Sequence, residues 1–144
     1  MKFKIMIIAV VVLFIYVGFV VSFQLLPIIK GGVVAKHYLE NLVKGDFTEA
    51  SKYLVDENQK TIMKQELSAL KEKGVSITSY KNVLIESDDG WITGKATITL
   101  SENKSNMDYS VFIIFGGSRL NPLVAHLEST EVDSNNLSKW LLIK

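Results

Sequence analysis

The chain has 144 residues, which is enough for one small domain beside a membrane segment but too few for two domains. The formal net charge is only +1, and once Lys2 and Lys4 are set aside the remaining 14 of the 16 basic residues face 15 acidic ones; this balance excludes the strongly basic composition of nucleic-acid-binding domains. There is no cysteine, which excludes disulfides, thiolate catalysis, cysteine-ligated zinc and lipid attachment through an N-terminal cysteine.

An uncharged and almost wholly apolar segment, Ile5 to Phe23, follows Lys2 and Lys4. As a helix these residues would rise ~28 Å, close to the ~30 Å hydrocarbon core of a bilayer, whereas the apolar region of a signal peptide is typically ~7 to 15 residues long. The length therefore favours an uncleaved membrane anchor. The positive-inside tendency predicts a cytoplasmic N-terminus and an extracellular C-terminal domain, that is, a single-pass protein of the cell membrane.

Cleavage of this segment is the main alternative. Val20 and Ser22 form a small-residue pair of the kind that precedes a signal-peptidase site, here before Phe23. Cleavage near Ser22 would release a secreted protein.

A domain boundary is expected just after the apolar segment. We expect residues 1–29 to form the anchor and residues 30–144 to form one exported domain. Pro27 and the Gly31-Gly32 pair predict a break in the helix and a flexible joint between these two parts.

Three helices are predicted after this joint. The first begins at about Val33 and ends at Gly45, which favours the left-handed conformation of a helix stop. Asp46 then caps the second helix, with Glu49 placed to complete a capping box, and the third runs from about Asn58 to Lys73. Apolar residues at helical spacing line the inner faces of these helices: Val34, Tyr38, Leu42, Phe47, Ala50, Tyr53, Leu54, Ile62, Met63, Leu67 and Leu70.

Beyond the third helix the apolar period changes to two, which indicates strands. Val75 to Glu86 and Trp91 to Glu102, joined by Asp89-Gly90, predict a β-hairpin. Met107 to Phe115 is apolar over most of its length and predicts a central strand, and Pro122 to Val132 is expected to pair beside it.

The closing segment, Lys139 to Lys144, is predicted as a final strand. Leu137, Trp140 and Leu141 also lie at helical spacing, so a short helix on the sheet or on the membrane surface remains the alternative.

One stretch, AKHYLENLVKGDFTEASKYL from Ala35 to Leu54, looks like the helix, Gly-Asp corner and second helix that open many small bacterial domains of one superfamily. Trp140 in KWLLIK resembles the tryptophan of their last strand. With the order of elements, these features resemble the nuclear transport factor 2-like, or cystatin-like, superfamily, which includes membrane-anchored domains of unknown function. The resemblance implies an α+β cone in which three helices pack on a curved antiparallel sheet of four to five strands. The additional chain from Asn121 to Asn136 departs from the shortest members and leaves the strand order there open.

The superfamily includes enzymes, ligand-binding domains and scaffolds, so the fold alone does not choose a function. A short cytoplasmic stub, one membrane helix and an exported domain resemble the layout of scaffold proteins in bacterial secretion and conjugation machines. No acid, base and donor set converges in the sequence. We therefore expect a non-enzymatic protein, without cofactor or metal, that binds another protein or itself at the cell envelope.

The alternative function is small-molecule binding or isomerase-like chemistry inside the cone. Such a site needs a carboxylate and a hydrogen-bond donor that face an apolar cavity. The ligand-binding candidates are Tyr38, Tyr53 and Trp140, with either tyrosine as the donor. His126 and Glu128 fall on one face of a strand about 7 Å apart, which makes a proton-transfer pair geometrically possible, but we expect them to face solvent or the outer side of the sheet.

The other polar residues suggest no site. Asp108 is expected to be a solvated loop carboxylate, and Glu86, Asp88 and Asp89 form an acidic hairpin turn. His37 and His126 are too far apart in sequence to suggest a metal site.

The apolar side chains decide between the two functions. Four apolar residues, if they fill the interior, would leave no room for a substrate: Phe47, Phe112, Ile114 and Trp140.

Overall fold

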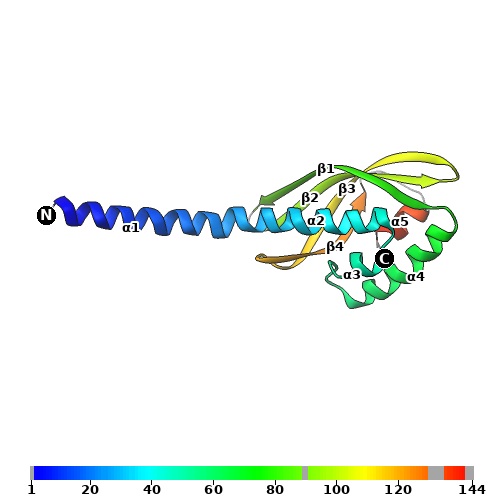
Figure 1. Cartoon of the computed structure of the whole chain (residues 1–144), viewed down its shortest axis with the longest axis horizontal. Coiled ribbons are helices and arrows are strands. Elements are labelled where there is room, and N and C mark those ends of the chain that lie inside the picture. Colours follow the sequence, from blue (N-terminus) through cyan, green and yellow to red (C-terminus); the bar gives the residue numbers. More distant parts are fainter. Residues whose placement is uncertain (1, 89–90, 130–134, 142–144) are drawn as a thin grey trace.

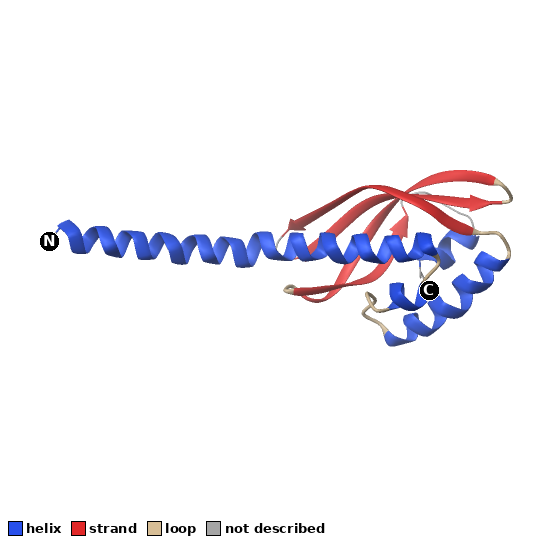
Figure 2. Cartoon of the chain, in the orientation of Figure 1, coloured by secondary structure: helices blue, strands red, loops and turns tan. Residues whose placement is uncertain are grey.

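The computed structural model describes residues 2–88, 91–129 and 135–141, and it has an α+β architecture (Figure 1). An N-terminal helix leads into an antiparallel sheet of four strands, one face of which is covered by helices (Figure 2). The helical elements are α1 (Lys2–Val20), η1 (Val21–Leu25), α2 (Leu26–Lys44), α3 (Phe47–Ser51), α4 (Glu57–Glu72) and α5 (Asn135–Leu141). The strands are β1 (Ser76–Asp88), β2 (Trp91–Glu102), β3 (Ser105–Ser118) and β4 (Asn121–Ser129). We call α2 to α5 with the sheet the α+β domain.

The predicted break after the apolar segment is wrong, because α1, η1 and α2 form one continuous helix (Figure 1). Pro27 lies in the first turn of α2 and has no N–H to donate to the carbonyl of Phe23, four residues earlier. The single π-helical turn η1 precedes it, with the Leu26 N–H bonded to the Val21 carbonyl five residues back. The side chain of Arg119 donates to the Phe23 carbonyl instead. The helix therefore passes through the proline.

The Gly31-Gly32 pair is a packing site and not a hinge. Gly31 is buried, and a Cβ atom there would lie 3.2 Å from Ile92 Cγ2 and 3.3 Å from Ile85 Cγ2. A Cβ atom on Gly32 would meet Ile85 at an ordinary 3.8 Å. The missing side chain of Gly31 thus lets α2 lie close against β1 and β2.

The corner between α2 and α3 forms largely as predicted. Gly45 is left-handed with φ 73°, and Asp46 Oδ1 accepts from the backbone N–H of Glu49 at 3.0 Å. The reciprocal half of the capping box does not form, because the Glu49 carboxylate pairs with Lys52.

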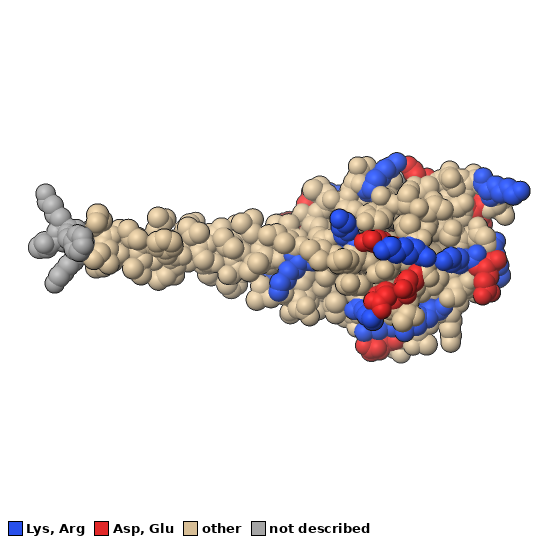
Figure 3. Space-filling model, in the orientation of Figure 1, with Lys and Arg blue, Asp and Glu red and all other residues tan. Residues whose placement is uncertain are grey.

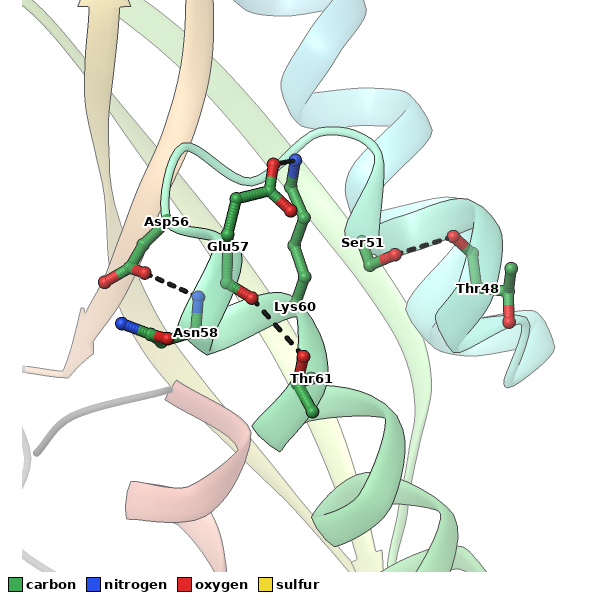
Figure 4. Close-up of polar contacts among 7 residues, drawn as sticks. All are labelled: Thr48, Ser51, Asp56, Glu57, Asn58, Lys60 and Thr61. Atoms are coloured by element: carbon green, nitrogen blue, oxygen red, sulfur yellow. Dashed lines mark hydrogen bonds and ion pairs between the residues drawn. The ribbon is translucent and has the colours of Figure 1, made fainter.

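The predicted second helix is shorter than expected. It ends at Ser51, whose hydroxyl donates to the Thr48 carbonyl at 2.8 Å (Figure 4). The next residues pair with β4: Val124 N–H donates to the Tyr53 carbonyl at 2.7 Å, and Val55 N–H donates to the Val124 carbonyl at 3.0 Å. This pairing pulls the chain out of the helix and against the sheet.

The predicted third helix is α4, and its start is fixed by a side-chain cap. Asp56 Oδ1 accepts from the backbone N–H of Asn58 at 2.7 Å, and the Lys60 ammonium group pairs with Glu57 in the first turn (Figure 4). The helix begins at Glu57, one residue before the predicted start.

The sheet is a meander in the order β1-β2-β3-β4, with each neighbouring pair antiparallel. The bounds of β2 match the prediction, whereas β3 is longer than predicted at both ends. It begins at Ser105, directly after a tight turn at Asn103 and Lys104, both of which have positive φ. The expected end of β4 beyond Ser129 and the Asp89-Gly90 turn lie outside the described residues.

The predicted closing strand is wrong, because Lys139 to Leu141 belong to the helix α5. Leu137, Trp140 and Leu141 are all buried. An i, i+3, i+4 spacing places the three side chains on one helical face, whereas a strand would direct Trp140 and Leu141 to opposite sides. The open alternative of a short helix is therefore the observed one, and residues 142–144 lie outside the described part.

Candidate functional site

The interior between the sheet and the helices is occupied by packed side chains. Tyr38 and Trp140 are each 0% exposed, and the Trp140 ring packs edge-on against Phe47 with ring centroids 5.7 Å apart. Phe112 and Ile114, the other two residues that could have filled the interior, are only partly buried, and Lys95 Nζ lies 5.9 Å from the Phe112 ring centroid. The apolar residues of β3 are thus divided between both faces of the sheet.

The three ligand-binding candidates have different surroundings. The Tyr38 hydroxyl and Trp140 Nε1 are buried and have no hydrogen-bond partner among the described residues. Burial raises the pKa of Tyr38, so this hydroxyl stays neutral. Tyr53 is only half-buried, and its ring stacks on the exposed ring of His37 with centroids 5.8 Å apart.

The structure brings His126 and Glu128 together, as their strand spacing suggested. His126 Nε2 and Glu128 Oε1 are 2.8 Å apart on β4. Both side chains remain partly exposed, while the intervening Leu127 is 0% exposed and faces the interior. The pair therefore lies on the opposite face of the strand from the packed interior. Within the described residues no group of three His, Asp or Glu side chains could hold a metal ion.

The expectation that Asp108 is a solvated loop carboxylate with no partner is wrong. Asp108 lies within β3, where it accepts from Lys81 Nζ of β1 at 2.6 Å and from Thr99 Oγ1 of β2 at 2.7 Å. The pKa of Asp108 is held below its ordinary value, mainly by the hydrogen bond from Lys81 and secondly by the one from Thr99. Ser79 Oγ extends the chain of bonds by donating to Thr99 Oγ1 at 2.8 Å. This network joins three strands on the outer face of the sheet.

An open depression of about 380 Å³ lies beside this network, and we call it the outer groove. Leu84 is 54% exposed at its margin, next to the β1 bulge at Asn82, which has φ 55°. The sequence gives no local signal of the groove, because the bulge shifts the register of β1 against β2. The groove is lined by Asn82, Leu84, Lys95, Ala96, Thr97, Ser110, Val111 and Phe112.

A second surface forms where the β3–β4 turn meets the long helix. Arg119 donates to the Phe23 carbonyl, and its guanidinium carbon lies 5.6 Å from the centroid of the Phe23 ring. Lys30 Nζ donates to the Leu120 carbonyl at 2.7 Å. A depression of about 320 Å³ opens between Phe23, Arg119 and Leu120, and a smaller one of about 90 Å³ lies between Arg119 and Trp91. We call Phe23, Lys30, Trp91, Arg119 and Leu120 the basal surface.

One helix in the described part of the chain, Met6–Lys44, is long and apolar enough to cross a membrane. The most apolar stretch of this helix has none of its residues buried in the rest of the molecule. We call α1 and η1 the shaft; from Met6 to Leu25 it has no acidic or basic side chains, whereas both kinds cover the visible face of the α+β domain (Figure 3).

Comparison of the chain with protein families, curated proteins and solved structures gives no match.

Proposed function

We propose that this chain is a single-pass membrane protein whose extracellular domain binds another protein, or a second copy of itself, at the cell envelope. The anchor is supported by the 25 uncharged residues between Lys4 and Lys30, which as a helix exceed the ~30 Å of a hydrocarbon core. The orientation is supported by Lys2 and Lys4 at the N-terminal end. In this proposal the α+β domain is a cone of the nuclear transport factor 2-like type.

The packed interior is the observation that best supports a non-enzymatic function. Enzymes and small-molecule binders with this architecture need a cavity lined by a few convergent polar groups. Here Tyr38, Phe47 and Trp140 occupy that space with apolar neighbours. The polar pair His126 and Glu128 lies on the other face.

The outer groove is the proposed protein-binding surface. Its apolar part is formed by Leu84 and Phe112, and its rim carries the ion pair of Lys95 with Glu86, whose Nζ and Oε2 atoms are 3.2 Å apart. An apolar centre with a polar rim is the usual anatomy of a protein interface.

Site-specific photo-crosslinking of the full chain in native membranes tests this function. A photoreactive residue at Ser110, within the outer groove, should give one discrete adduct, and the substitution Leu84→Asp should abolish it. The control probe at Glu66, exposed on α4, should give no adduct. Two differently tagged copies show whether the captured protein is a second copy of the chain. Adducts that form equally from Ser110 and Glu66, or that persist with Leu84→Asp, would contradict the proposal.

A second function, ligand binding in the interior, is favoured by one observation. The Tyr38 hydroxyl and Trp140 Nε1 are buried without partners among the described residues, and bound polar molecules are one way in which such groups are satisfied. Native mass spectrometry of the full chain tests this function. A retained small molecule that is lost with Tyr38→Phe would support it, whereas a mass equal to the bare chain would exclude it under those conditions.

A further inference from the structure

The structure points to a second contact with the membrane, made by the basal surface. We infer that this surface sits in the phospholipid headgroup region of the bilayer that holds α1, and that Arg119 binds a lipid phosphate there. This inference rests on the proposed membrane anchoring. It gives the turn between β3 and β4, which follows α1 by about a hundred residues in the chain, a role in contacting the membrane.

The position of the basal surface along the N-terminal helix determines how deep this surface lies in the bilayer. If Lys4 marks the inner membrane surface, the ~20 helical residues needed to cross the hydrocarbon core end close to Phe23. Arg119 and Leu120 form a depression together with Phe23, so they lie at the level where the acyl chains meet the headgroups. Lys30 is seven residues further along, about 10 Å at the rise of a helix, and reaches the headgroup and water layer.

The chemistry of Arg119 suits a phosphate group. One guanidinium nitrogen donates to the Phe23 carbonyl, and the Nε atom is buried without a partner among the described residues. A guanidinium group has five N–H donors in a planar fork, so several remain for a phosphate oxygen. Within the described part of the chain neither Arg119 nor Lys30 forms an ion pair with an acidic residue.

The apolar members of the basal surface suit the same layer. Trp91 is 75% exposed and Leu120 is 52% exposed, although both belong to a folded domain. Tryptophan is enriched where membranes meet water, because its ring is apolar and its N–H still finds a polar partner. Trp91 lines the same depression as Arg119, so one surface presents both an aromatic ring and a cation to the lipid.

Tryptophan fluorescence provides the test, since the chain has two tryptophans and only Trp91 is exposed. The full chain is reconstituted in vesicles of equal parts phosphatidylcholine and phosphatidylglycerol, with the phosphatidylcholine brominated near the top of its acyl chains. We expect the brominated lipid to quench the emission, and Trp91→Phe to remove the quenchable fraction. Flotation of the vesicles reports anchoring independently.

The outcomes separate this inference from the proposed anchoring. Protein that floats with the vesicles but whose Trp91 is not quenched remains anchored, and the seating of the basal surface is rejected. Protein that does not float contradicts both. A Trp91 that is shielded from aqueous acrylamide but not quenched by brominated lipid is covered by protein, which also overturns the inference.

The role of the phosphate is tested by changing the residue and the lipid together. In phospholipid vesicles Arg119→Gln should reduce the quenching of Trp91, whereas Lys64→Gln, a matched loss of charge on α4, should not. In bilayers of digalactosyldiacylglycerol, which has no phosphate and is itself brominated at the same acyl-chain positions, the unchanged chain should behave like the Arg119→Gln variant. If Arg119→Gln reduces the quenching equally in both lipids, Arg119 acts only through the Phe23 carbonyl and the phosphate contact is rejected.

Discussion

The buried hydroxyl of Tyr38 has a direct consequence for stability. Among the described residues this hydroxyl has no hydrogen-bond partner. A buried polar group without a partner costs about 1 to 3 kcal/mol, so Tyr38→Phe should raise the free energy of unfolding by ~1 to 3 kcal/mol. Chemical denaturation of the full chain in detergent micelles measures this change. Tyr53→Phe, at a half-buried position, is the control and should change stability by no more than about 0.5 kcal/mol. A clear loss of stability in Tyr38→Phe would show that the hydroxyl has a partner.

The network of Asp108 predicts a dependence of stability on pH. The folded-state pKa of Asp108 is lowered by Lys81 and Thr99, so its contribution to stability is complete above the unfolded-state pKa of about 3.9 and is lost as the pH falls through the lower folded-state pKa. The stability difference between the unchanged chain and Asp108→Asn should therefore be constant near neutral pH and shrink below about pH 4.

Denaturation of the two proteins at a series of pH values measures that difference. In a Lys81→Gln background the effect of Asp108→Asn should depend less on pH, because the main cause of the lowered pKa is gone. A difference that grows as the pH falls would have the wrong sign for this network.

Local residue chemistry was predicted better from the sequence than contacts between strands. The Asp46 cap depends on a residue three positions away and forms, and His126 and Glu128, two positions apart, share one strand face as their spacing predicted. Asp108 was assigned no partner because its contacts to Lys81 and Thr99 depend on the register of three strands. That register includes the bulge near Asn82, for which the sequence carries no clear signal.

At the scale of elements, the two neighbouring glycines of α2 should respond differently to substitution. Gly32→Ala has room for its Cβ and should stabilise the protein by about 0.5 to 1 kcal/mol through helix propensity. Gly31→Leu would push α2 away from Ile85 and Ile92 and should destabilise it by about 1 to 3 kcal/mol. Thermal unfolding of the full chain in micelles compares the variants. Equal effects at both positions would indicate the flexible joint that the sequence suggested.

Two predicted elements were wrong for reasons that lie far away in the chain. Pro27 was expected to end a helix, but the Phe23 carbonyl that it leaves without a backbone donor is bonded by Arg119, 96 residues further on. The closing segment was assigned as a strand, although Trp140 packs on Phe47 of α3 and is buried from a helical face. Neither partner could be identified from local sequence patterns.

At the scale of the whole molecule, the sequence correctly predicted an apolar helix followed by helices and then an antiparallel sheet. These features depend on the apolar composition and periodicity of long segments, and both can be read directly from the sequence. The continuity of the helix from α1 into α2 adds a property that the sequence did not suggest. The α+β domain is joined to the apolar shaft by a helix held by Arg119 and Lys30, so its position relative to the shaft is fixed by specific contacts.

The central claim is that the apolar helix holds the α+β domain on the outer side of a cell membrane. Because the chain has no cysteine, Lys64→Cys on α4 supplies a single thiol in the domain, and Lys2→Cys supplies one at the opposite end. Intact bacterial cells expressing each variant are treated with a membrane-impermeant maleimide, and the membranes are then extracted with alkaline carbonate. We predict that Cys at position 64 is labelled in intact cells, that Cys at position 2 is labelled only after permeabilisation, and that both chains stay in the membrane pellet. Labelling of position 64 only after lysis, or release of the chain into the soluble fraction, would contradict this account.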